Sequence, residues 1–311
     1  MNRIVSLIAS ATEIVCRLGL RSELVWVSHE CDFPNDVTNL PACSSPKINV
    51  HGSSREIDDR VKAALQDALS VYDVRRELLE DLQPTIVITQ TQCDVCAVNL
   101  QDVEAVVGEW LDHQPKIVSL EPNELQDVWQ DILRVAQAAE VTERGTDLVA
   151  DLKASLSALS ERTAQLHPPS IACIEWLDPL MAAGNWIPEL VQAAGGRNLF
   201  GQAGTHSPWI TWEELVNADP DVIVTMPCGF DIARTLEEQH LLTEHPAWAG
   251  LRAVREGRIY VLDGNAYFNR PGPRLVDSAY LLAEVLHPSV FPSTFQGSGW
   301  IRDERMIFST G

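Results

Sequence analysis

The chain has 311 residues, of which 45% are hydrophobic, and it carries a formal net charge of −21. This length allows two domains of ordinary size, each with a core of its own. The acidic charge argues against nucleic-acid binding, because phosphate backbones are bound by basic surfaces. No apolar run approaches the roughly 20 residues of a membrane span, so we expect a globular protein without membrane insertion.

The first residues lack the pattern of an export signal. Arg3 is followed by a short apolar run, Ile4 to Ala9, which contains a serine and is soon followed by Glu13. A signal peptide has a longer apolar segment and a small-residue cleavage site, and Cys16 lacks the small residues that precede a lipoprotein cysteine. We therefore expect a cytoplasmic protein. A periplasmic protein is the alternative if translation begins upstream of Met1.

The first 121 residues alternate short apolar runs with amphipathic segments. The apolar runs predict strands at 4–8, 24–28, 84–90 and 116–120. The amphipathic segments predict helices at 10–18, 56–70, 75–82 and 103–110. Ser10 or Thr12 is the expected N-cap of the first helix and Gly19 its end, while 29–54 is expected to be irregular. This alternation is typical of a parallel sheet with helices on both faces.

Apolar residues then repeat at helical spacing from Glu124 to about Leu166, with only Gly145 interrupting them. This segment predicts about 40 residues of nearly continuous helix, which exceeds the usual 8 to 20 residues of a globular helix. We expect it to join two lobes as a rigid connection.

The strand–helix pattern resumes after Pro169. It predicts strands at 170–176, 221–226 and 259–262, and helices near Glu189 and at 212–218, 233–242 and 274–286. Pro188 and Gly195 bound the helix that follows Trp186, so Trp186 is expected at a loop edge. The fold class is therefore α/β, with an N-terminal lobe at 1–121, a linking backbone helix at 122–167, a C-terminal lobe at 168–290 and an irregular tail at 291–311.

Four stretches in this order make the chain resemble the class III substrate-binding proteins, a helical-backbone group that binds cobalamin, siderophores and haem. They are 4–13 (IVSLIASATE), 185–200 (NWIPELVQAAGGRNLF), 207–223 (SPWITWEELVNADPDVI) and 269–274 (NRPGPR). The resemblance extends to about residue 287, and the cobalamin-binding branch is the most similar.

This resemblance implies two Rossmann-like lobes with parallel sheets, a long backbone helix between them and a ligand cleft between the lobes. It also implies a non-enzymatic protein that binds a corrinoid such as cobalamin, or a related tetrapyrrole or metal chelate, for scavenging, storage or delivery. An ABC transporter permease is an expected partner only if the chain is exported. The alternative in which the chain is an importer receptor requires an export signal upstream of Met1.

Aromatic and polar side chains cluster where strands of the C-terminal lobe end. Ligands of open α/β sheets bind beyond the carboxyl ends of the strands, and a flat macrocycle suits aromatic walls with a few polar groups. The predicted ligand-binding residues are Trp176, Trp186, Trp209, Tyr267, Phe268, Glu175, Asn269, Arg270 and Arg274. A contrasting interpretation is that some of these rings fill the interface between the lobes.

The chain has seven cysteines, an odd number that does not suggest a disulfide framework in a reducing compartment. Cys93 and Cys96 form a CxxC pair after a strand, which supplies half of a tetrahedral site. His29 or Cys31, also at a strand end, would complete a zinc or iron–sulfur site, and the chain would then be a metal or redox-sensing protein. The same residues could instead supply a ligand to a corrinoid cobalt, or the two cysteines could be a reduced pair of thiols that binds no metal.

Motifs for catalysis are absent. The sequence has no GxSxG, no HExxH and no phosphate-binding glycine loop, so we expect no enzyme. Glu13 and Glu189 are expected on solvated helix faces.

Overall fold

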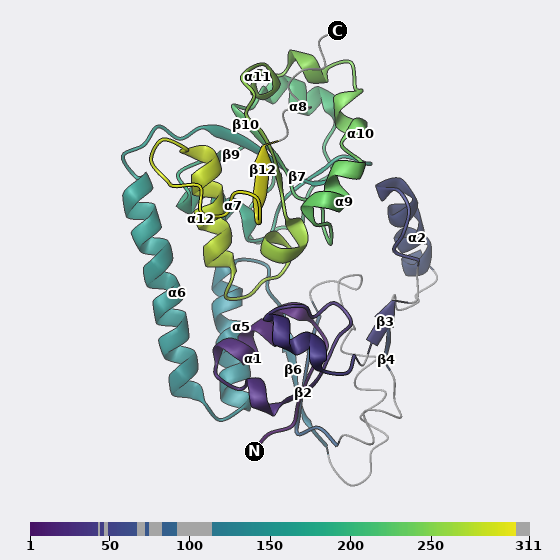
Figure 1. Cartoon of the computed structure of the whole chain (residues 1–311), viewed down its shortest axis with the longest axis vertical. Coiled ribbons are helices and arrows are strands. Elements are labelled where there is room, and N and C mark those ends of the chain that lie inside the picture. The colour runs from purple at the N-terminus through teal and green to yellow at the C-terminus, as the bar shows by residue number, and fades with distance from the viewer. Residues whose placement is uncertain (43, 47–48, 67–71, 75–82, 92–113, 303–311) are drawn as a thin grey trace. The chain divides into compact units, whose positions relative to one another are not determined.

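The computed structural model describes residues 1–42, 44–46, 49–66, 72–74, 83–91 and 114–302 (Figure 1). The chain divides into two compact units. Unit 1 comprises Met1–Pro122 and Gln126–Asp151, and unit 2 comprises Asn123–Leu125 and Leu152–Gly311. Within the described ranges, no helix has the length and apolar character needed to cross a membrane.

Unit 1 is built on a parallel sheet with the strand order β2-β1-β5-β6. Its strands are β1 Ile4–Ser6, β2 Leu24–Val27, β5 Ile86–Gln90 and β6 Lys116–Leu120, with a separate pair β3 Ser44–Pro46 and β4 Tyr72–Val74. Its helices are α1 Ala9–Arg17, η1 Arg21–Glu23, η2 Asn35–Asn39, α2 Ser54–Gln66 and α5 Leu125–Ala138, of which Leu125 belongs to unit 2. The buried apolar residues of β1 and β5 confirm the predicted sheet. The helices expected at 75–82 and 103–110 lie outside the described residues.

Two local predictions for unit 1 are wrong. Helix α1 begins at Ala9, after Ile8, and neither Ser10 nor Thr12 is its N-cap, because the hydroxyl of Thr12 instead donates to Ser6 Oγ at 2.8 Å. The stretch 29–54 is not wholly irregular, since it contains η2 and the strand β3, which pairs antiparallel with β4. The predicted end at Gly19 is confirmed by its φ of +75°, a left-handed conformation that glycine adopts without strain.

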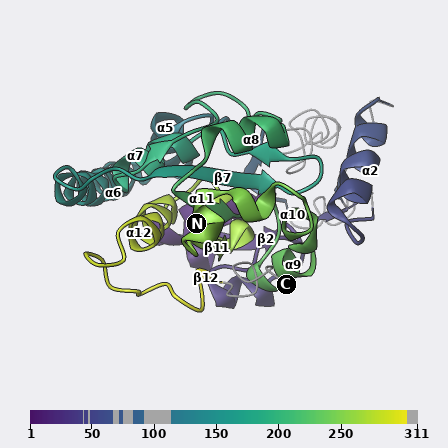
Figure 2. The same ribbon diagram turned by 90° about the horizontal axis from the view of Figure 1, so that it is seen from above.

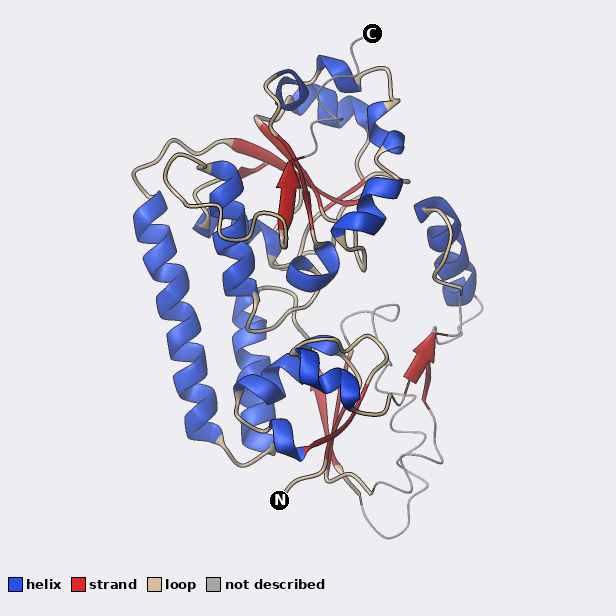
Figure 3. Ribbon diagram, in the orientation of Figure 1, coloured by secondary structure: helices blue, strands red, loops and turns tan. Residues whose placement is uncertain are grey.

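A pair of long helices, α5 and α6 Thr142–Thr163, lies at the boundary between the units in the sequence (Figure 3). The predicted helix of about 40 residues is these two helices. Glu140, at φ +62°, turns the chain between them, and a side chain at Gly145 would overlap Ala136, so the start of α6 packs closely on the end of α5. The sequence did not predict this break, because apolar residues continue at helical spacing on both sides of the short turn. Helix α6 contributes residues to both units, since the boundary falls between Asp151 and Leu152.

Unit 2 contains a sheet with the strand order β12-β11-β10-β7-β8, and β9 also pairs with β7. Strands β7 and β11 of this sheet are labelled in Figure 2. Its strands are β7 Ser170–Trp176, β8 Met181–Ala182, β9 Arg197–Asn198, β10 Val222–Thr225, β11 Ile259–Leu262 and β12 Trp300–Arg302. Its helices after α6 are α7 Ile187–Ala193, α8 Trp212–Ala218, α9 Ile232–Glu237, α10 His240–Thr243, η3 Trp248–Gly250, α11 Arg252–Arg255, the π-helical turn η4 Gly264–Phe268 and α12 Leu275–Leu286. One core cluster joins β7, β10 and β11 to α8, α10, η3 and α11.

Three predictions for unit 2 need correction. The strands β7, β10 and β11 are parallel as expected, but β8 and β12 pair antiparallel at the edges. The tail predicted to be irregular contains β12, which Trp300 anchors by donating from Nε1 to Glu284 at 2.7 Å. The helix expected at 233–242 is divided into α9 and α10, because Glu238 N–H bonds Thr235 in a tighter turn.

Helix α7 has the predicted boundaries. Pro188 lies in its first turn, where a missing N–H costs nothing. Gly195, at φ +75°, ends the helix, and Gly196 N–H bonds Val191 O at 2.9 Å, which satisfies a terminal carbonyl group.

Candidate functional site

Three segments of unit 2 meet where the parallel strands β7, β10 and β11 end. The backbone N–H of Cys228, after β10, donates to Glu175 O in β7 at 3.1 Å. The N–H of Asn265, in η4 after β11, donates to Phe230 O at 3.0 Å. These bonds link the three segments into one rigid surface at the edge where ligands of α/β sheets bind. We call it the strand-end site.

Trp176 is the central aromatic residue of the strand-end site. Its ring centroid lies 5.3 Å from that of Phe230, with an interplanar angle of 51°. The guanidinium of Arg234 lies 4.2 Å from the Phe230 centroid, within the range of a cation–π contact. Trp176 is 9% exposed, and its buried Nε1 has no hydrogen-bond partner among the described residues. Phe230 and Arg234 were not among the predicted residues, although the strand-end rule applied to residues after 225 would have found Phe230.

Trp209 is the exposed ring among the predicted aromatic residues, with 51% of its surface accessible. Its backbone forms a bridge with Met181 of β8, and Met181 lies opposite Trp176 in the register of β7 and β8. Residues 208 and 210 are hydrogen-bonded to the β8 segment at 3.0 and 2.9 Å. The ring is therefore held by a fixed backbone and presents its surface to solvent.

Trp186 and Phe268 lie in the interior. Trp186 is 6% exposed and Phe268 is fully buried, and the indole Nε1 donates to Phe268 O at 2.9 Å. Trp186 lies in the turn that begins α7, as expected, but its ring does not form an exposed edge, because this bond and the surrounding core hold it inside unit 2. Ligand contact by these two rings stays a prediction.

The segment after β11 carries the remaining predicted residues. Tyr267 is half-buried, which raises the pKa of its hydroxyl, and the guanidinium of Arg274 lies 5.6 Å from its ring centroid. Arg270 is buried and donates to Asn265 Oδ1 at 3.2 Å. The side-chain oxygen of Asn269 is buried, and no group in the described part of the chain donates to it.

Glu175 is tied to the turn before α7. It accepts a hydrogen bond from Ser207 Oγ at 2.8 Å, and Ser207 Oγ in turn accepts from the Gly184 N–H at 3.0 Å. Burial raises the pKa of Glu175, although the Ser207 bond opposes this shift. The side chain is thus a structural acceptor at the strand end.

Unit 1 has small polar groups at its own strand ends. The thiol of Cys31 lies 3.1 Å from Thr12 Oγ1 and is buried. His29 Nδ1 lies 2.9 Å from Ser44 Oγ, and burial lowers the pKa of this histidine. Within the described residues no group of three or more His, Cys, Asp or Glu is placed to hold a metal ion.

Cys93 and Cys96, the other half of the predicted metal site, lie outside the described residues. A zinc or iron–sulfur site using them therefore stays a prediction.

Of the two glutamates expected on solvated faces, Glu13 is buried and Glu189 is half-buried and hydrogen-bonded. Glu13 is 2% exposed within α1. Glu189 accepts a hydrogen bond from the Leu125 N–H at 2.7 Å and so caps the first turn of α5. Helical spacing alone could not reveal these tertiary contacts.

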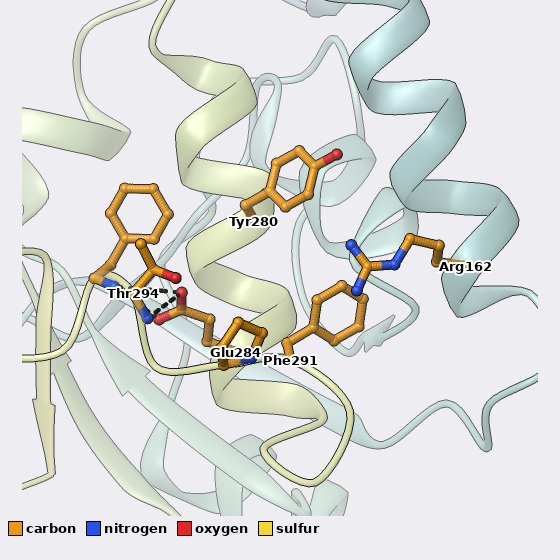
Figure 4. Close-up of a pocket in the computed structure, with 7 residues that line it drawn as sticks. Arg162, Tyr280, Glu284, Phe291 and Thr294 are labelled. Carbon is orange, nitrogen blue, oxygen red and sulfur yellow. Dashed lines mark hydrogen bonds between the residues drawn. The ribbon is translucent and has the colours of Figure 1, made fainter.

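A small cavity of about 200 Å³ lies elsewhere in unit 2, between α6, α12 and the segment 291–295 (Figure 4). The guanidinium of Arg162 lies 4.4 Å from the Phe291 ring centroid at one side. Glu284 accepts from the Thr294 N–H at 2.8 Å and from Trp300 at its other edge. The cavity is smaller than the roughly 300 to 1,000 Å³ of ordinary ligand pockets, and none of the predicted ligand-binding residues lines it.

Comparisons with known proteins extend over nearly the whole chain. The family model described as periplasmic binding protein matches residues 4–266. The vitamin B12-binding protein of Vibrio parahaemolyticus is 22% identical over 290 residues, covering 91% of this chain and 89% of that protein. The ABC transporter substrate-binding lipoprotein YvrC of Bacillus subtilis is 22% identical over 298 residues, covering 93% and 81%.

Two solved structures have a similar fold. A periplasmic heme-binding protein from Pseudomonas aeruginosa has a TM-score of 0.70 at 22% identity, covering 93% of this chain and 94% of that one. The periplasmic vitamin B12-binding protein BtuF of Vibrio cholerae has a TM-score of 0.65 at 20% identity, covering 93% and 97%. At these identities the likeness supports the α/β fold and leaves the ligand open.

Proposed function

Because this chain belongs to the periplasmic binding protein family, we propose that it binds a corrinoid such as cobalamin, or a related tetrapyrrole or metal chelate, for scavenging, storage or delivery. The family and the relatives are substrate-binding proteins, so the chain is a binding protein and not an enzyme. The observation that carries the ligand class is the match to a vitamin B12-binding protein over about nine-tenths of both chains.

The chemistry of the strand-end site supports this ligand class. The Trp176–Phe230 pair and the exposed Trp209 provide aromatic surface, which suits the face and edge of a flat macrocycle. Asn269 and Arg270 supply polar groups on the adjoining segment. The expected ligand cleft between the lobes stays a prediction.

The relatives also bear on location and partner. They are described as periplasmic, or as a lipoprotein of an ABC transporter. These descriptions support an exported location, rather than the cytoplasmic one expected from the first residues, and a transporter permease as partner. Both belong to this proposal.

The test is a binding titration of the purified chain with cyanocobalamin, hemin and a ferric siderophore, followed by visible absorption and tryptophan fluorescence. We expect binding of at least one macrocycle at micromolar concentration. Trp209→Ala should weaken it roughly 10-fold, because an exposed ring that stacks on the ligand is removed. Val216→Ala, which removes another exposed apolar side chain from unit 2, should leave the affinity unchanged.

Absence of binding to all three probes at micromolar concentration would overturn the proposal. Equal losses in Trp209→Ala and Val216→Ala would exclude Trp209 from the ligand site.

A further inference from the structure

We propose that Trp176 and Asn269 recognise neutral primary amides on the rim of the ligand, so that the strand-end site prefers an amide-bearing corrinoid over a carboxylate-bearing macrocycle. This inference rests on the proposed function and concerns its specificity. Trp176 is the last residue of β7 and Asn269 lies in the segment after β11, and these two strands flank β10 in the sheet.

The first observation is an unpaired donor. Trp176 is 91% buried, as its exposure of 9% implies, yet its Nε1 meets no acceptor within the described ranges. A buried indole N–H normally finds an acceptor, because leaving it unpaired costs free energy. The similar indole of Trp186 does find one, at Phe268 O. The difference marks Trp176 as a donor that an acceptor on a ligand would satisfy.

The second observation is an unpaired acceptor. Asn269 Oδ1 is buried and has no partner in the described structure, whereas the amide oxygen of Asn265 in the same segment accepts from Arg270 at 3.2 Å. The Asn269 backbone N–H is bonded to Gly264 O at 3.0 Å, so the residue itself is held in place. A ligand that donates a hydrogen bond would satisfy this oxygen.

A primary amide can satisfy both the Trp176 N–H donor and the Asn269 oxygen acceptor. Its oxygen accepts from an indole N–H and its NH2 group donates to a carbonyl oxygen, whereas an ionised carboxylate only accepts. A carboxylate beside Asn269 would leave two acceptors facing each other, and a buried unpaired polar group is destabilising. Corrinoids carry primary amides around the ring, while haem carries carboxylates.

The charge around the site points the same way. The chain has a formal net charge of −21, which disfavours a ligand with several carboxylates. The cations described near the site are engaged within the chain, since Arg270 donates to Asn265, Arg274 lies over the Tyr267 ring and Arg234 pairs with Glu238.

The experiment compares two probes with the same cobalt-corrin ring: cyanocobinamide, which has amide side chains, and dicyanocobyrinic acid, which has carboxylates in their place. Dissociation constants are measured for the wild type, Trp176→Phe and Asn269→Ala. Trp300→Phe is the matched control, because it removes an indole N–H that is bonded to Glu284, outside the strand-end site. Circular dichroism verifies that each variant is folded, and the two test variants provide independent tests.

We expect the wild type to prefer cyanocobinamide. Trp176→Phe and Asn269→Ala should each lower that preference about 5-fold, the effect of one hydrogen bond. Trp300→Phe should leave the ratio of the two dissociation constants unchanged. An unchanged ratio in both test variants, or a wild type that prefers the acid, overturns this inference while the proposed function stands. A wild type that binds neither corrinoid overturns this inference, and the proposed function is overturned as well only if the chain also fails to bind cyanocobalamin, hemin and the ferric siderophore.

Discussion

The indole Nε1 of Trp186 donates a 2.9 Å hydrogen bond to the backbone carbonyl oxygen of Phe268. The bond joins the start of α7 to the end of η4, 82 residues further along the chain. Because Asn269 directly follows Phe268, this contact also fixes one end of the strand-end site. Trp186 is therefore a structural residue. Its removal would alter the strand-end site only indirectly, through Phe268 and Asn269.

Trp186→Phe should lower the free energy of unfolding by about 1–3 kcal/mol, because it leaves a buried carbonyl oxygen unpaired. Urea unfolding followed by circular dichroism measures the change. Trp209→Phe alters a ring that is 51% exposed and should change stability by less than about 0.5 kcal/mol. Equal losses in the two variants would contradict a structural role for Trp186.

Gly201→Ala should destabilise unit 2 far more than Gly229→Ala. Both glycines have positive φ, at +71° and +75°, so alanine at either costs about 1–2 kcal/mol in backbone strain. At Gly201 the added Cβ would also overlap the carbonyl oxygen of Ala183, whereas no atom of the described residues lies within 4 Å of the Cβ at Gly229. Thermal unfolding of the two variants compares the effects, and equal melting temperatures would show that the overlap is relieved without cost.

The buried Asp131 should make the protein less stable as the pH rises from about 4 to about 7. Burial raises the pKa of this carboxyl to about 7, although Arg134 and the Glu121 N–H oppose the shift. The folded state then holds a proton that the unfolded chain, with a pKa of about 3.9, has released. Asp131→Asn does not titrate and should flatten this part of the stability curve. Urea midpoints at pH 4.5 and pH 8 measure the difference.

Asp221 should have the opposite pH dependence. Burial raises its pKa, but bonds from the Ser170 hydroxyl and N–H and the ion pair with Arg252 outweigh burial and lower the pKa to about 2. The stabilisation is present above the unfolded pKa of about 3.9 and is lost as the pH falls toward 2.

Asp221→Asn should therefore be less stable than the wild type at pH 7, and the gap should narrow between pH 4 and pH 2. Thermal unfolding across that range tests the sign. A stability difference between the two proteins that is constant with pH would mean that the Asp221 charge contributes nothing to the stability of the folded state.

Local patterns predicted most strands and several helix ends. The apolar runs at β1, β5, β7, β10 and β11 and the glycine ends of α1 and α7 are confirmed, because these signals depend on neighbouring residues. The break between α5 and α6 was not predicted, since one periodicity continues on both sides of the turn at Glu140. The antiparallel edge strands were not predicted either, because β8 has only two residues and β12 lies in a polar tail.

The alternation of strands and helices in each half of the chain, the helical segment between the halves and the resemblance to the substrate-binding family follow from the sequence itself, through periodicity, turn residues and motif order. Only the tertiary structure decided which of these side chains are exposed and which are buried. It buried Trp186 and Phe268, left Trp209 exposed, placed Phe230 against Trp176, and used Glu189 to cap α5. Burial and hydrogen-bond partners come from residues far apart in the chain, so no local pattern contains them.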